Sequence, residues 1–194
     1  MTNLRRFLPA AIGVVALALL AWGVTAILER LTAPDVETAV TTAPPATPDR
    51  PLIAATLFYA APEGDALMPI RREVPFAEGL VAQGRQILIA QLEPPPSPYV
   101  STIPTGTMLR SFYVTDRGDA FVDLSSIAGH PGGSLTELLT VQSIVHAVTA
   151  NLPAVQRVQI LVAGKEVDTL AGHVDIRRPL TRDESVLRAT EAAP

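Results

Sequence analysis

The sequence predicts an α+β fold, a two-layer sandwich in which two helices cover one face of a mixed or antiparallel sheet. Segments with the period of strands and segments with the period of helices follow one another between residues 52 and 179, in the order strand, strand, helix, hairpin, helix, hairpin. Helices gathered on one face of such a sheet form two layers around one core. The chain before residue 52 differs in kind, since a long apolar run is followed there by a proline-rich stretch.

The N-terminal region predicts a transmembrane anchor. Phe7–Leu28 carries no charge and is long enough to cross a bilayer, which takes roughly 20 residues. Two arginines precede it, so the positive-inside rule keeps residues 1–6 in the cytoplasm and places the following domain on the extracytoplasmic side. A cleaved signal peptide is the alternative, because Val24–Ala26 resembles a small-residue cleavage site. Residues 29–51 are rich in Pro, Thr and Ala and predict a linker with a reach of roughly 60 Å.

The first half of the folded region predicts two strands and a helix. Leu52–Tyr59 is a strand, and Leu67–Phe76 is a second extended segment whose two prolines indicate an edge position. Ala77–Leu92 has its apolar residues at helical spacing, and a Glu-Pro-Pro-Pro run ends it. Next, Met108–Thr115 and Ala120–Leu124 predict a hairpin around a turn that contains Gly118.

A second helix and a second hairpin complete the predicted domain. Ser134 and Glu137 have the spacing of a capping box, so we expect them at the N-cap and N3 positions of a helix. Its apolar stripe is Leu138, Val141, Val145, Val148 and Leu152. Val155–Val162 alternates as a strand, and Glu166–Leu170 returns after a turn. Residues 180–194 are assigned to a C-terminal tail, either frayed or a short helix.

Composition argues against several kinds of site. The formal charge of −4 and the pI near 5.3 disfavour a nucleic-acid surface, which normally needs a basic face. The absence of cysteine excludes disulfides, thiolate metal sites and a lipid-modified cysteine.

No candidate set of polar residues predicts a catalytic, cofactor-binding or metal site. The histidines, none of which stands at a ligand spacing from another, are His130, His146 and His173. The aspartates of the central hairpin lack the pattern of a calcium loop and fit a turn, and they are Asp116, Asp119 and Asp123. Arg71 and Arg72 fit solvated edge-strand charges better than an anion site. Gly129–Gly133 precedes a helix without the phosphate-loop lysine, and no Gly-x-Ser-x-Gly is present.

Six segments together carry a resemblance to a known family. They are Leu57–Tyr59, Leu67–Val74, Ile103–Thr107, Ala120–Ser125, Leu138–Asn151 and Val155–Lys165. In this order and spacing they resemble the GerMN domain, the module named from the spore germination protein GerM, over about Leu52–Pro179. The resemblance implies an extracytoplasmic, membrane-tethered domain with a fold similar to the ring-building domains of secretion and sporulation complexes. It implies binding and assembly, and it brings no catalytic residues. This chain differs from that protein in having one copy of the domain and no lipid-anchor cysteine.

Two functional hypotheses follow. In the first, which we favour, the chain is a single-pass membrane protein without enzymatic activity, cofactor or small-molecule substrate. Its extracytoplasmic domain binds envelope proteins or itself, and the edge around Pro69–Pro75 is the expected contact. In the second, the chain is an envelope enzyme or a cell-wall ligand-binding module that uses Asp119, Asp123 and His130, and a concave pocket gathers these groups.

Overall fold

The computed structural model describes residues 51–125, 127 and 133–188. The chain divides into two units, Met1–Thr47 and Pro48–Pro194, and all described residues belong to the second. The predicted transmembrane run and nearly all of the predicted linker lie outside the described residues. Among the residues that are described, no helix is long and apolar enough to span a bilayer.

The domain contains two separate sheets. In the first, β1 (Leu52–Ala60) and β2 (Leu67–Pro75) pair antiparallel along their full length. In the second, β3 (Leu109–Val114) and β4 (Asp119–Leu124) form the predicted hairpin, in whose turn Gly118 has a φ of +79°.

Two further strands complete the second sheet, whose order is β3-β4-β5-β6. β5 (Arg157–Val162) runs parallel to β4, and the short β6 (Lys165–Glu166) pairs antiparallel with β5. A parallel pair requires a long crossover, and the helix before β5 provides it. The sheet is therefore mixed.

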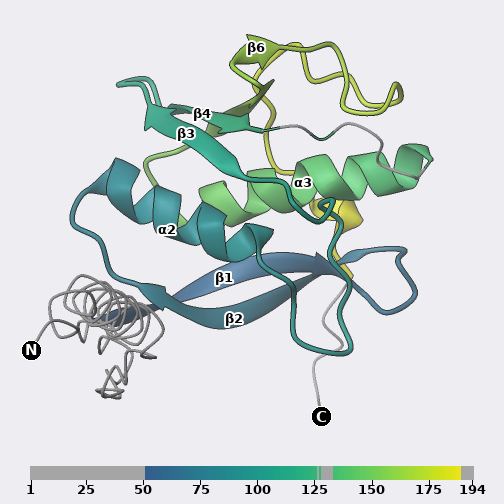
Figure 1. Ribbon diagram of the computed structural model, residues 1–194, viewed down its shortest axis with the longest axis horizontal. Helices are drawn as coiled ribbons and strands as arrows, with labels where there is room; N and C mark the ends of the chain where they lie inside the picture. Colours follow the sequence, from purple (N-terminus) through teal and green to yellow (C-terminus); the bar gives the residue numbers. More distant parts are fainter. Residues whose placement is uncertain (1–50, 126, 128–132, 189–194) are drawn as a thin grey trace, which may run out of the picture. The chain divides into compact units, whose positions relative to one another are not determined.

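Both predicted helices form, and they lie in a layer between the two sheets (Figure 1). α2 (Leu80–Leu92) packs on β1 and β3, and α3 (Ser134–Asn151) packs on β1 and β5. The α+β class is as predicted, but the single sheet and the two layers are wrong, because a sheet lies on each side of the helices. The reason is visible in α3, where every residue of Leu139–Thr149 is buried, so that both faces of the helix need cover.

A glycine allows α2 to lie close under β3. A Cβ at Gly84 would stand 2.3 Å from Cε1 of Phe112 and 3.0 Å from Cδ1 of Leu152. The helix begins at Leu80, later than predicted, because Gly79 ahead of it has a φ of +89°, far outside the helical region.

The start of α3 departs from the predicted capping box. Its N-cap is Gly133, one residue before Ser134, and no side chain caps this end. Glu137 instead directs its carboxylate at the loop after β6, where it accepts hydrogen bonds from three backbone N–H groups of residues 170–173. These bonds also explain why the predicted strand Glu166–Leu170 ends at its first residue. The backbone N–H groups of the loop donate to the Glu137 carboxylate instead of pairing with a neighbouring strand.

The C-terminal segment, residues 180–188, packs on the domain beyond the predicted boundary. Leu180 and Val158 of β5 exchange backbone hydrogen bonds of 2.8 Å in both directions. A 3₁₀ turn, η1 (Glu184–Val186), follows and buries its last residue. Next to it, the N–H of Arg188 donates to the carbonyl of Leu67 in β2. This segment therefore belongs to the fold and touches both sheets.

Candidate interaction surface

The predicted histidine candidates occupy separate environments. His130 lies outside the described residues. His146 is buried against Phe58, and its Nε2 lies 3.1 Å from the carbonyl oxygen of Asp183, so the neutral ring donates from this nitrogen. Burial lowers the pKa of His146, although the bond to Asp183 opposes the shift. His173 is half-exposed and bonds Glu137 through Nδ1 at 3.0 Å. Both side chains thus hold the fold together.

Two of the three hairpin aspartates are engaged in ion pairs. Asp119 forms an ion pair with Arg157 at 2.7 Å. The buried Asp123 pairs with Arg110 at 3.2 Å and accepts a 2.8 Å hydrogen bond from the N–H of Gly164. Within the described residues no group of three or more acidic or histidine side chains could hold a metal ion. The residues 129–132 of the predicted anion loop lie outside the described residues.

Arg72 departs from the solvated edge charge that the sequence predicted. Its guanidinium donates to the Tyr59 hydroxyl at 2.9 Å and pairs with Glu93 at 3.1 Å, whereas Arg71 is exposed. Burial raises the pKa of Tyr59, although the bond from Arg72 opposes the rise. The arginine therefore ties β2 to the end of α2.

The outer edge of β1 is closed by side-chain amides. Asn151 donates to the carbonyl of Thr56 at 2.7 Å and accepts from its N–H at 2.8 Å. Gln91 makes the same two bonds with Phe58, at 2.7 and 2.9 Å. The last residue of β1 exchanges backbone bonds with Val100. These groups take the place of a neighbouring strand along residues 56–60.

The outer edge of β2 is protected in a different way. The residues of β2 that pair with the outward-facing residues of β1 also direct their backbone groups away from the ladder. They include Pro69 and Pro75, which have no N–H group to donate. Between them stand the charged Arg71 and Glu73, and Leu67 is already bonded by the C-terminal segment. Prolines and charges are common protections of an edge strand. The edge around Pro69–Pro75, expected from the sequence as the contact, is thus poorly suited to receive a strand.

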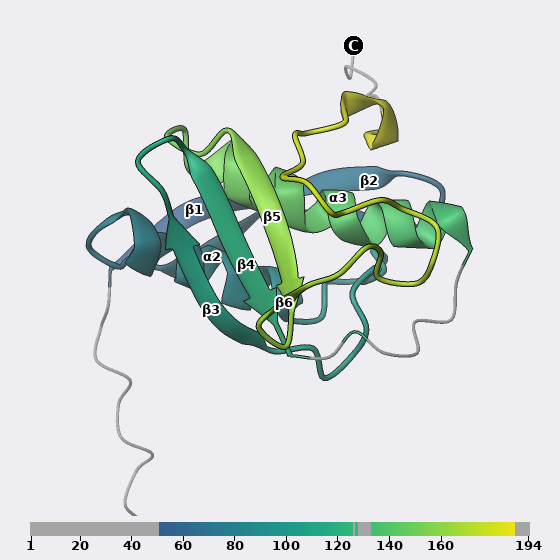
Figure 2. The ribbon, with the colours of Figure 1, turned by 90° about the horizontal axis from the view of Figure 1, so that it is seen from above.

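The outer edge of β3 is open. The N–H of Thr115 donates to the carbonyl of Asp119, and by alternation Tyr113 and Phe121 form the next bonded pair along this ladder. The backbone groups of Phe112 and Val114 therefore point away from β4. Within the described part of the chain nothing bonds to them, and β3 is the outermost strand of its sheet (Figure 2).

An apolar groove lies at the beginning of this edge. It has a volume of about 390 Å³ between the end of α2 and the start of β3, and is lined by Ile89, Leu92, Glu93, Pro94, Thr107, Met108 and Leu109. Met108 is 66% exposed, and Val81 and Ile89 on α2 are also exposed. None of the predicted polar candidates that the structure describes lines the groove. An added strand could therefore bond β3 and place apolar side chains on α2.

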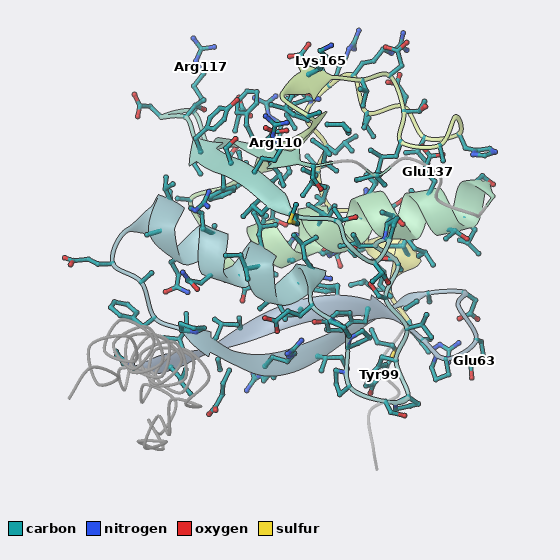
Figure 3. All side chains as sticks on the ribbon, in the orientation of Figure 1. Glu63, Tyr99, Arg110, Arg117, Glu137 and Lys165 are labelled. Atoms are coloured by element: carbon teal, nitrogen blue, oxygen red, sulfur yellow. The ribbon has the colours of Figure 1, made fainter. Side chains whose placement is uncertain are left out.

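The face of the sheet beyond the helices adds an aromatic pair to this surface. Tyr113 of β3 stacks on Phe121 of β4, with ring centroids 5.0 Å apart and planes inclined by 11°, and 44% of Tyr113 is exposed. Arg110 lies over the same sheet, and Arg117 projects from the hairpin turn (Figure 3). Tyrosine and arginine are enriched where proteins bind one another.

Sequence reasoning missed the β3 edge because the order of strands in a sheet decides which strand is outermost. One signal was present. The strand Leu109–Val114 contains no proline and one charge, and an exposed Met precedes it, whereas the other long edge candidate holds two prolines.

The fold and this surface define a class: an α+β domain with two helices between two sheets and an open edge at β3. The family model for Germane, described as sporulation and spore germination, matches residues 56–168, more than half of the chain. The chain therefore belongs to the Germane family, and the resemblance to GerMN domains is confirmed.

Solved structures share the fold. A candidate lipoprotein from Clostridium perfringens is 24% identical with a TM-score of 0.51, over 69% of this chain and 89% of that one. The tandem GerMN domains of the sporulation protein GerM from Bacillus subtilis are 16% identical with a TM-score of 0.54, over 68% of this chain and 46% of that one. The first GerMN domain alone is 17% identical with a TM-score of 0.50, over 68% and 96%. No curated protein matches the chain.

Proposed function

We propose that this chain is a membrane-anchored, extracytoplasmic protein that acts without catalysis by binding other proteins in a cell-envelope complex related to sporulation or germination. The open edge of β3 beside the apolar groove is the observation that carries this proposal. Strand addition by a partner needs unpaired backbone groups together with pockets for side chains, and both are present there.

The state of the ionisable side chains supports a binding role. Asp119 and Asp123 are held in ion pairs, Glu137 is occupied by a loop, and His146 is buried. None of them faces the groove, so the surface offers apolar and backbone contacts and little chemistry. Such a surface suits a protein partner better than a substrate.

The proposed location rests on the sequence and on one relative. Phe7–Leu28 is an uncharged apolar run of bilayer length. The similar protein from Clostridium perfringens is described as a candidate lipoprotein. Because this chain has no cysteine to carry a lipid, the apolar run would serve as its anchor.

Site-directed photo-crosslinking in intact cells tests the proposal. A photoreactive amino acid replaces Met108 at the groove in the full-length protein, and the matched control replaces Leu135, which is also apolar and exposed but lies on α3. We expect irradiation to give covalent adducts with membrane-fraction proteins from position 108 only. Adducts from neither position, or the same adducts from both, would overturn the binding role of this surface.

A further inference from the structure

We propose that the open edge of β3 pairs with β3 of a second copy of this chain, antiparallel and about a two-fold axis at Tyr113. The inference rests on the proposed function, because it names the partner of the same surface. In this register Phe112 of each copy lies opposite Val114 of the other, and both residues have backbone groups that point outward. They can therefore exchange both hydrogen bonds, and the two four-stranded sheets become one continuous sheet.

Charge complementarity selects this register. With Tyr113 on the axis, Arg110 of one copy, where β3 shifts its register against β4, comes beside Asp116 in the hairpin turn of the other copy, and the symmetry repeats the pair. Arg110 is half-exposed although it already pairs with Asp123, so its guanidinium keeps donors free. Asp116 has no ion pair within the described residues. A self-complementary patch of this kind is what a two-fold interface requires.

Aromatic stacking points to the same axis. Tyr113 and Phe121 form a hydrogen-bonded pair, so on its other side Tyr113 would meet its symmetry mate as a non-bonded pair, in which side chains lie closest. Its exposed ring already stacks on Phe121. The dimer would extend this stack across the axis, and such aromatic contacts stabilise cross-strand neighbours.

The helix below the edge leaves apolar surface beside the proposed seam. α2 lies under β3 and exposes Val81 and Ile89 (Figure 1). Phe112 of each copy stays packed on Gly84 of its own α2, and continuing the register brings the turn at Arg117 of the second copy over the start of β3, where the groove lies. The same apolar surface that is exposed in one copy is covered in the pair.

Engineered cysteines test the register, because the natural chain has none. Under a mild oxidant, we expect full-length protein with Tyr113→Cys to form an intermolecular disulfide, since these positions face each other at the axis. Ser111→Cys alone should form no such disulfide, because Ser111 of one copy lies opposite Thr115 of the other and not opposite its own symmetry mate. A mixture of Ser111→Cys and Thr115→Cys should therefore form one. Disulfides from Ser111→Cys alone as readily as from Tyr113→Cys would overturn the register.

Sedimentation of the full-length protein in detergent tests the pairing itself. We expect Asp116→Arg to weaken dimerisation about tenfold, because it sets two arginines against each other in each symmetric pair. Glu73→Arg on β2 is the matched control and should leave dimerisation unchanged. A monomer at every concentration, without disulfides from Tyr113→Cys, would overturn self-pairing. If Met108 still crosslinks to a different protein, that result would leave the proposed function standing.

Discussion

Glu137 is a buried charge that is held mainly by the backbone. Its side chain is 1% exposed, and it accepts hydrogen bonds of 2.8 to 3.0 Å from three backbone N–H groups and the ring of His173. Burial alone would raise the pKa of this carboxyl, but the hydrogen bonds, led by the N–H of Ala171, outweigh burial and lower it. The carboxylate therefore fixes the loop after β6 against α3.

Glu137→Gln should lower the free energy of unfolding by about 2–3 kcal/mol, because an amide NH₂ would face backbone N–H groups that then lack an acceptor. Urea denaturation of the purified protein measures this loss. Glu166→Gln on the exposed β6 is the control and should change stability by less than about 0.5 kcal/mol. Equal losses in both variants would show that the loop is held by other contacts.

His146 should make stability depend on pH. Burial lowers its pKa in the folded protein, whereas the unfolded chain binds the proton near the ordinary value of about 6.5. Between these two values the unfolded state holds more protons, so the free energy of unfolding falls as the pH falls below about 6.5. Urea titrations at pH 7 and 5.5 should show this fall, and His146→Gln should reduce it. The half-exposed His173→Gln should retain it, and an unchanged fall in His146→Gln would contradict the assignment.

At the scale of elements, Gly84 sets the distance between α2 and β3. Glycine inside a helix is usually less stable than alanine by up to about 1 kcal/mol. Here Gly84→Ala should instead lower the free energy of unfolding by about 1–3 kcal/mol, because the new Cβ would overlap Phe112. Denaturant unfolding shows whether Gly84→Ala lowers or raises the free energy of unfolding. Combining Gly84→Ala with Phe112→Leu should cost less than the sum of the single changes, and strict additivity would show that the two positions do not meet.

The sequence predicted most elements well, but the N-terminal ends of the two helices and the extent of β6 poorly. Alternation located β1, β3, β4 and β5 to within about two residues, and apolar spacing located both helices. The capping-box prediction was wrong because two sets of backbone N–H donors compete for the Glu137 carboxylate. Those of the α3 N-terminus lie next to it in the sequence, and those of the loop after β6 are brought near only by the fold. Spacing along the chain cannot rank two such partners.

The candidate surface was harder to predict than the elements. Gln91 and Asn151 read as ordinary helix residues, yet they close the edge of β1, and only the packing of both helices on that strand brings them there. Without knowing how the helices and strands pack, one cannot decide whether the edge of β2 or the edge of β3 is open to a partner strand. Four of the polar residues considered as site candidates bond to other parts of the domain, and they are Asp119, Asp123, His146 and His173.

At the scale of the whole molecule, the three layers follow from the composition of α3. A helix that is buried all round needs cover on both sides, and the apolar stripe Leu138–Leu152 is supplemented on other faces by Leu139, Ile144 and Ala147. A count of apolar residues per helix face would have indicated a second sheet. Periodicity could not show that β1 and β2 form a separate two-stranded sheet. Apolar and polar residues alternate in the same way whether the strands belong to one sheet or to two.

The C-terminal segment should stabilise the whole domain, because it joins elements far apart in the sequence. Ending the chain after Pro179 removes the pairing of Leu180 with Val158, the buried Val186 and the bond from Arg188 to β2. We expect a loss of about 3–5 kcal/mol in the free energy of unfolding, measured by urea denaturation. A chain that ends after Arg188 is the matched control and should keep its full stability. If the two truncated chains unfolded at the same urea concentration, residues 180–188 would lie on the domain without stabilising it.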